Sequence, residues 1–114
     1  MTRIELLLIA VIQVESGGDP NAVGDKGSAV GILQIRPCMV AECNRILGCN
    51  RFTLDDRKSI SASKAMFRVY VGKWGKGKSL EVMARRWNGG PTGEKKSATK
   101  KYWIKVKREL ERQK

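Results

Sequence analysis

The chain has 114 residues, 41% of them hydrophobic, which is enough for one modest core and too little for two. The 23 Lys and Arg residues exceed the 11 Asp and Glu residues, and the formal net charge is +12. Histidine is absent, which excludes Ser–His–Asp and Cys–His nucleophile systems, histidine-ligated zinc hydrolases and haem on a proximal histidine.

The first predicted element is a helix that begins after Thr2 and ends at Gly17. Thr2 and Glu5 have the spacing of a capping box, which satisfies two backbone amides at a helix start. Apart from Gln13, residues 6–14 are apolar, so we expect this helix to run through the middle of the core. The apolar run is too short to span a bilayer and lacks a small-residue cleavage site, so we expect neither a transmembrane segment nor a signal peptide.

Four more helices are predicted after a loop at residues 16–31, which is rich in Gly, Asp and Asn and suits a short hairpin. Pro37 opens the second helix, which reaches Leu47 before the stop at Gly48. The other three follow capping residues: one runs from Thr53 to about Gly72, one from Ser79 to about Asn88, and the last opens at Ser97 or Thr99. The sequence therefore predicts a mainly helical single domain over residues 1–114, with about five helices and a Gly-rich loop.

Glu15 stands at the C-terminal end of the first predicted helix. The negative end of the helix dipole disfavours a charged carboxylate there, and apolar neighbours remove it from water. Both effects raise the pKa of Glu15. A raised pKa suits a general acid, which must still hold its proton near neutral pH.

Three segments carry motifs in a fixed order. Residues 15–35 begin with Glu-Ser, continue in a Gly-rich loop and end in Gly-Ile-Leu-Gln-Ile; residues 87–90 read Trp-Asn-Gly-Gly; residues 99–106 read Thr-x-x-Tyr-x-x-x-Val. In this order they resemble the soluble lytic transglycosylases and the related goose-type lysozymes, and the short chain is similar to small phage-encoded wall-cleaving enzymes. The resemblance implies a lysozyme-like fold that cleaves the MurNAc–GlcNAc β-1,4 bond of peptidoglycan without a metal or cofactor.

The resemblance also implies roles for individual residues. Glu15 matches the family's catalytic Glu, which protonates the glycosidic oxygen. The transglycosylase reaction needs no second carboxylate, because the 6-hydroxyl of the sugar closes a 1,6-anhydro ring and Glu15 takes up the proton of that hydroxyl. Trp87 has two interpretations, a platform for a sugar face or a core residue. The residues expected to line the substrate site are Ser16, Gln34, Trp87, Asn88 and Tyr102.

Asp25 keeps a second reaction open. Residues 24–27, Gly-Asp-Lys-Gly, resemble a Gly-Asp-Arg-Gly segment of goose-type lysozymes, in which the Asp helps to place a water molecule. Asp25 is therefore either the second catalytic carboxylate of a muramidase or an ordinary turn residue. A further Asp of the goose-type enzymes is replaced by Arg36, which favours the transglycosylase.

The second half of the chain is strongly basic, since residues 64–114 hold 16 of the 23 basic residues and 4 of the 11 acidic ones. This predicts a polyanionic partner, and an anionic cell-envelope polymer or outer-membrane surface fits an enzyme of the wall. A nucleic-acid-binding module is an alternative because three Trp residues lie among Lys and Arg residues, although no recognisable module accompanies them.

Residues 72–79 match the phosphate-binding loop G-x-x-x-x-G-K-[ST], which makes nucleotide binding a further alternative. Such a site needs a preceding strand, for which the apolar residues 66–71 are the candidate. It also needs an acidic residue on a later strand to hold magnesium, and no strand-like run supplies one.

The chain has three cysteines, Cys38, Cys43 and Cys49, and an odd number cannot pair completely in intramolecular disulfides. We therefore expect them to be small, partly buried thiols. Free thiols suit a cytoplasmic environment. We expect a monomer that accumulates in a host cytoplasm and is released to the periplasm or wall, or that travels with a virion; this route follows from the family resemblance.

Overall fold

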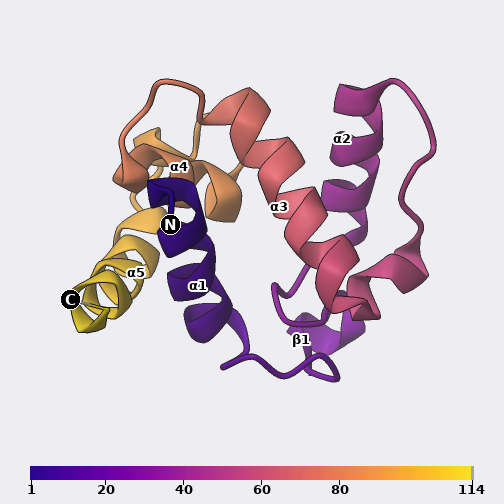
Figure 1. Cartoon of the computed structure of the whole chain (residues 1–114), viewed down its shortest axis with the longest axis horizontal. Helices are drawn as coiled ribbons and strands as arrows, with labels where there is room; N and C mark the ends of the chain where they lie inside the picture. The colour runs from indigo at the N-terminus through magenta and orange to yellow at the C-terminus, as the bar shows by residue number, and fades with distance from the viewer. Residues whose placement is uncertain (114) are drawn as a thin grey trace.

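The computed structural model describes residues 1–113, whose arrangement is shown in Figure 1. The α-helices are α1 (Arg3–Glu15), α2 (Pro37–Leu47), α3 (Ile60–Trp74), α4 (Leu80–Gly89) and α5 (Thr99–Arg112). Between them lie the 3-10 helices η1 (Asp25–Gly27), η2 (Leu54–Lys58) and η3 (Gly93–Lys95), and strands β1 (Val23–Gly24) and β2 (Ala29–Val30) pair antiparallel. The prediction of a mainly helical domain with five helices and a short hairpin is confirmed. Within these residues no helix is both long enough and apolar enough to cross a membrane.

Helix α1 starts as predicted, with the Thr2 hydroxyl accepting a hydrogen bond from the Glu5 amide at 3.1 Å. Neighbouring helices bury one side of α1, which carries Leu7, Leu8, Ala10 and Val11. On the other side Ile9 remains 46% exposed. The expectation that α1 runs through the middle of the core is therefore wrong, because α3, α4 and α5 cover only part of its circumference.

Two successive caps decide where α3 starts. The capping box predicted at Thr53 is present, with the Thr53 amide donating to Asp56 at 2.8 Å, but it begins only the 3-10 helix η2. Ser59 is then extended, and its hydroxyl accepts from the Ala62 amide at 3.1 Å, which starts α3. The single long helix predicted here is therefore two elements, and its end lies at Trp74.

The remaining helix ends follow local signals. Helix α2 begins at Pro37, and Gly48 ends it with a φ of 71°, a left-handed value that favours glycine. The Ser79 hydroxyl caps α4 by accepting from the Val82 amide at 3.2 Å. Of the two predicted starts for α5, the structure selects Thr99.

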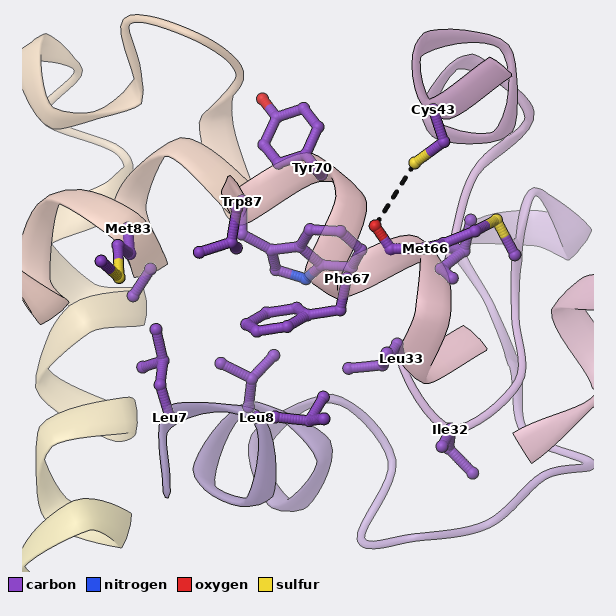
Figure 2. Close-up of a cluster of buried hydrophobic side chains, with 14 of the residues drawn as sticks. Leu7, Leu8, Ile32, Leu33, Cys43, Met66, Phe67, Tyr70, Met83 and Trp87 are labelled. Carbon is purple, nitrogen blue, oxygen red and sulfur yellow. Dashed lines mark hydrogen bonds between the residues drawn. The ribbon is translucent and has the colours of Figure 1, made fainter. Parts of the chain in front are cut away.

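The core lies where α1, α3 and α4 meet, and Figure 2 shows its aromatic centre. The Trp87 ring stands edge-on to Phe67, with centroids 5.0 Å apart, and to Tyr70, with centroids 5.6 Å apart. Each such contact contributes about 0.5–1.5 kcal/mol beyond the area it buries. The aromatic cluster therefore holds the last turn of α4 against α3, at the point where residues 88–90 begin.

The structure excludes the phosphate-binding loop. Residues 66–71, which would have to form a strand, lie inside α3, and α3 continues into the first residues of the motif. The carbonyl of Lys78 accepts a hydrogen bond from Arg3 at 2.8 Å, which ties the end of this segment to α1. A phosphate-binding loop needs a turn from strand to helix, whereas residues 72–74 here end α3 and residues 75–79 connect it to α4.

The three cysteines are free thiols with different environments. Cys43 is buried, and burial raises the pKa of its thiol to about 12. Cys38 and Cys49 are exposed, so the prediction of partly buried thiols is wrong for these two. Their positions on and after the amphipathic helix α2 explain the difference, since only Cys43 lies on its inner face.

Candidate active site

A cleft of about 650 Å³ is lined by residues of α1, α2, α3 and α4 and of the loops that follow β2 and α4. Its walls combine carboxylates, basic side chains, aromatic rings and amides. The lining side chains with such groups are Glu15, Gln34, Arg36, Glu42, Arg45, Tyr70, Trp74, Trp87, Asn88 and Lys96.

Glu15 is the last residue of α1, and its half-buried side chain lines this cleft. The Tyr102 hydroxyl of α5 donates a hydrogen bond to Glu15 Oε2 at 3.0 Å. These two residues are 87 positions apart in the sequence, and the packing of α1 on α5 brings them together. The structure thus pairs two of the residues that the sequence selected.

Burial raises the pKa of Glu15 from its ordinary value of 4.5 to about 7. The hydrogen bond from Tyr102 opposes this rise most strongly, and the charge of Arg36 and the Trp87 indole act in the same direction as Tyr102. Burial and the Glu15 charge in turn raise the pKa of the Tyr102 hydroxyl well above its usual value, so Tyr102 remains a hydrogen-bond donor. At neutral pH Glu15 is therefore divided between its acid and its carboxylate forms.

Ser16 and Gln34 hold the Gly-rich loop beside Glu15. The Ser16 hydroxyl donates to the carbonyl of Ile32 at 2.7 Å, which ties the end of α1 to residues 31–35. The Gln34 amide donates to the carbonyls of Ala22 and Gly31, both at 3.1 Å, and Gln34 itself has a φ of 50°. Gln34 lines the cleft, whereas Ser16 supports the loop from outside the lining.

Asp25 lies outside the cleft lining. Its carboxylate is exposed and accepts from Arg36 Nε at 2.8 Å, with a second Arg36 nitrogen at 2.6 Å. Arg36 itself lines the cleft, so the ion pair joins the hairpin to the rim of the site. In this structure Asp25 therefore orients Arg36, and it does not stand beside Glu15.

Trp87 and Asn88 are neighbours with different environments. Trp87 is 6% exposed, and its ring is packed among the core aromatics while one edge contributes to the cleft. This placement favours the core interpretation over a sugar platform. Asn88 is exposed and lines the cleft together with Gly89 and Gly90, where its amide is free to contact a ligand.

Sequence reasoning missed a second polar cluster on the cleft wall, formed by Glu42, Arg45 and Trp74. The Trp74 indole donates to Glu42 Oε2 at 2.8 Å, and Arg45 Nε donates to the other oxygen at 2.7 Å. The bond from Arg45 is the main reason that the pKa of Glu42 lies below its usual value. The spacing of three residues between Glu42 and Arg45 could have predicted their ion pair from the sequence. Only the fold brings Trp74 of α3 to the same carboxylate.

A mainly helical domain with a half-buried acid at the end of its first helix, facing a cleft, has the features expected of a lysozyme-like fold. A family profile described as the Transglycosylase SLT domain matches residues 3–109, and the chain belongs to this family. A chain in the crystal structure of Aeromonas hydrophila PliI in complex with Meretrix lusoria lysozyme is similar, with 27% identity and a TM-score of 0.76. The similarity covers 95% of this chain and 93% of that one. A search of curated proteins finds no match.

Proposed function

We propose that this domain cleaves the MurNAc–GlcNAc β-1,4 bond of peptidoglycan as a lytic transglycosylase, with Glu15 as general acid and base. The observation that carries the proposal is the half-buried Glu15 carboxyl, which lines the cleft and has a pKa of about 7. Membership of the SLT family supports peptidoglycan as the substrate.

The first step needs a proton donor at the leaving oxygen. Glu15 gives its proton to the glycosidic oxygen, the bond from that oxygen to the anomeric carbon of MurNAc breaks, and GlcNAc leaves as an alcohol. Glu15 is then a carboxylate that keeps the hydrogen bond from Tyr102. It accepts the proton of the MurNAc 6-hydroxyl as that oxygen bonds to the anomeric carbon, so a 1,6-anhydro ring forms and Glu15 is protonated again.

The place of Asp25 supports this route over hydrolysis. Hydrolysis needs a second carboxylate to activate water or to act as nucleophile, whereas Asp25 lies outside the cleft lining and its Oδ2 atom pairs with Arg36. Glu42 lines the cleft, but Arg45 and Trp74 occupy its oxygens. A muramidase in which Asp25 assists water is the second candidate, and the similarity to a chain of a crystal structure that holds PliI and a lysozyme keeps it open.

Mass spectrometry of the sugars released from purified peptidoglycan tests the proposal. The wild type should release ends of 1,6-anhydro-MurNAc, and Glu15→Gln should release none. Glu5→Gln is the matched control, since Glu5 lies on the same helix and pairs with Arg68 at 2.8 Å. Reducing MurNAc ends would favour the muramidase, and full activity in Glu15→Gln would refute the role of Glu15.

We also propose that the outer face of α5 holds the enzyme on anionic polymers of the cell envelope. Six basic side chains of this helix are exposed: Lys100, Lys101, Lys105, Lys107, Arg108 and Arg112, the last of which pairs with Glu109. Their combined field attracts polyanions and is screened by salt. Binding to isolated walls should therefore fall steeply as the ionic strength rises.

A further inference from the structure

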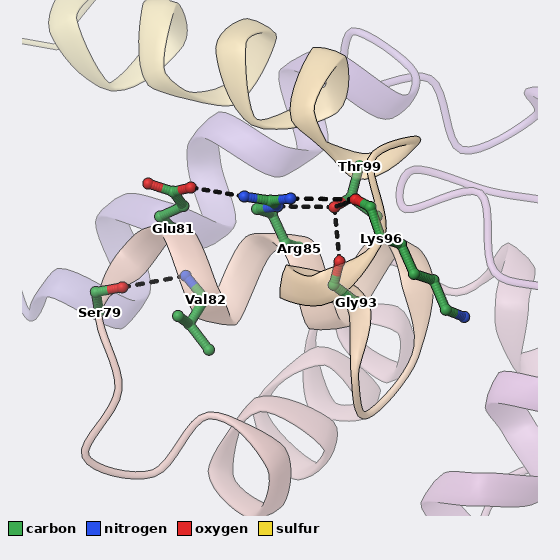
Figure 3. Close-up of polar contacts among 7 residues, drawn as sticks. All are labelled: Ser79, Glu81, Val82, Arg85, Gly93, Lys96 and Thr99. Atoms are coloured by element: carbon green, nitrogen blue, oxygen red, sulfur yellow. Dashed lines mark hydrogen bonds and ion pairs between the residues drawn. The ribbon is translucent and has the colours of Figure 1, made fainter.

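The guanidinium of Arg85 is buried at the junction of α4 and α5, and each of its three nitrogens donates a hydrogen bond (Figure 3). Arg85 Nε donates to the Thr99 hydroxyl at 2.7 Å, and its two terminal nitrogens donate to Glu81 at 2.8 Å and to the Lys96 carbonyl at 3.1 Å. A buried charge is costly unless it is paired and hydrogen-bonded. The segment that supplies two of these three acceptors is therefore held in place.

Thr99 is the first residue of α5, and it is 1% exposed. Its hydroxyl oxygen accepts from Arg85, and its single proton is shared between the carbonyls of Gly93 at 2.7 Å and Lys96 at 2.9 Å. The N-cap residue, Ala98, has no side chain that can bond to the first amides of the helix. The contact between Arg85 and Thr99 thus takes the place of a helix cap in anchoring the start of α5.

Close packing leaves this anchor little freedom. A Cβ atom added at Gly93 would lie 1.9 Å from the Arg85 carbonyl oxygen, and one added at Gly89 would lie 2.6 Å from Thr99 Cγ2. Only glycine fits at either position without a shift. The loop between α4 and α5 is therefore pressed onto α4, and Thr99 is held from two sides.

Tyr102 lies three residues after Thr99, one turn further along the same side of α5. Its hydroxyl reaches Glu15 at 3.0 Å. We propose that Arg85 and Thr99 are positioning residues: their buried contact fixes the start of α5 and so sets where the Tyr102 hydroxyl stands relative to the Glu15 carboxyl. The importance of this contact for catalysis rests on the proposed function. Its effect on the position of Tyr102 relative to Glu15 does not.

The link has a measurable consequence at Glu15. The groups that act on its carboxyl come from three elements: Tyr102 from α5, Arg36 from the start of α2 and Trp87 from α4. Hydrogen bonds weaken steeply as they lengthen or bend. If the start of α5 loosens, the Tyr102 bond to the carboxylate weakens, and the pKa of Glu15 rises above 7 while the other two contributions stay in place.

A carbon-13 NMR titration of the Glu15 carboxyl tests this directly and does not depend on enzymatic activity. Tyr102→Phe removes the hydrogen bond itself and should raise the Glu15 pKa by about 1. Thr99→Val keeps the shape of the side chain but removes the hydroxyl, and it should raise the Glu15 pKa by no more than Tyr102→Phe does. Thr99→Ser restores the hydroxyl and should return the wild-type value. Arg85→Lys keeps a charge beside Glu81 but loses the Nε hydrogen bond to Thr99, and it should also raise the Glu15 pKa. It is the second variant should Thr99→Val fail to fold.

The double variant Thr99→Val with Tyr102→Phe distinguishes positioning from general loosening. If Thr99 acts through Tyr102, the double variant should have the Glu15 pKa of Tyr102→Phe alone. Asn44→Ala is the control for stability, because Asn44 bonds to the Phe52 backbone in both directions at 2.9 Å away from the cleft lining. An unchanged Glu15 pKa in Thr99→Val, an additive double variant or an equal shift in Asn44→Ala would overturn the proposal. A wild type that cleaves no glycan yet shows the expected titrations would refute only the proposed function.

Discussion

Replacing Glu15 by Gln should stabilise the folded protein above neutral pH while it removes activity. In the folded state the pKa of Glu15 is about 7, because burial disfavours its charged form, against an ordinary value of 4.5. At pH 4 the side chain is largely protonated in both the folded and the unfolded chain, so its ionisation costs little stability. Between pH 4.5 and 7 the unfolded chain loses this proton first, and the stability of the wild type falls.

The size of this effect follows from the two pKa values. A difference of about 2.5 corresponds to roughly 3 kcal/mol, at 1.36 kcal/mol for each pKa unit, and the full cost is present above pH 7. Gln carries no charge at any of these pH values, so Glu15→Gln avoids the cost. Its free energy of unfolding should match that of the wild type near pH 4 and exceed it by about 2–3 kcal/mol at pH 8.

Urea denaturation followed by Trp fluorescence, from pH 4 to 8.5, measures this difference. Glu5→Gln is the control on the same helix, and the sign of its effect should be opposite. The hydrogen bond from Arg68 lowers the pKa of Glu5, so the Glu5 carboxylate stabilises the folded state once ionised, and its loss should weaken the protein above about pH 4.5. Stability curves of Glu15→Gln and wild type that run parallel across the whole pH range would refute the reasoning.

Three further predictions concern other parts of the molecule. Asp25→Asn should leave the rate of 1,6-anhydro product formation within about twofold, because Asp25 lies outside the cleft lining; a loss above about 100-fold would instead indicate catalysis by Asp25. Changing Lys100, Lys101 and Lys105 to Glu should weaken sedimentation with walls at low salt but not cleavage of short soluble glycans, and unchanged binding would exclude these lysines as the anchor. Gly93→Ala should lower the free energy of unfolding by about 1–3 kcal/mol in urea, since its Cβ has no space; an unchanged midpoint would contradict the close packing described.

Local signals in the sequence were sufficient for most helix boundaries. Pro37 and Gly48 bound α2, and Ser79 caps α4, because a fixed φ, a left-handed φ and a side-chain acceptor act within one turn of the residue that carries them. The capping box at Thr53 also formed, but Ser59 interrupted the helix that should have followed. The two caps lie six residues apart and both form, so local signals alone do not say which of them opens the long helix.

The sequence by itself determined the fold class, most helix boundaries and the candidate acid, since the motifs and the position of Glu15 at a helix end are local properties. Tertiary structure alone decided what surrounds that acid. Tyr102 approaches from 87 residues away, Arg36 on the cleft wall pairs with Asp25 outside the cleft lining, and Arg85 donates a hydrogen bond to Thr99 at the start of α5. The physical reason is that burial and hydrogen bonding depend on which helix faces meet in space, and they set the pKa of a carboxyl far more strongly than its neighbours in sequence.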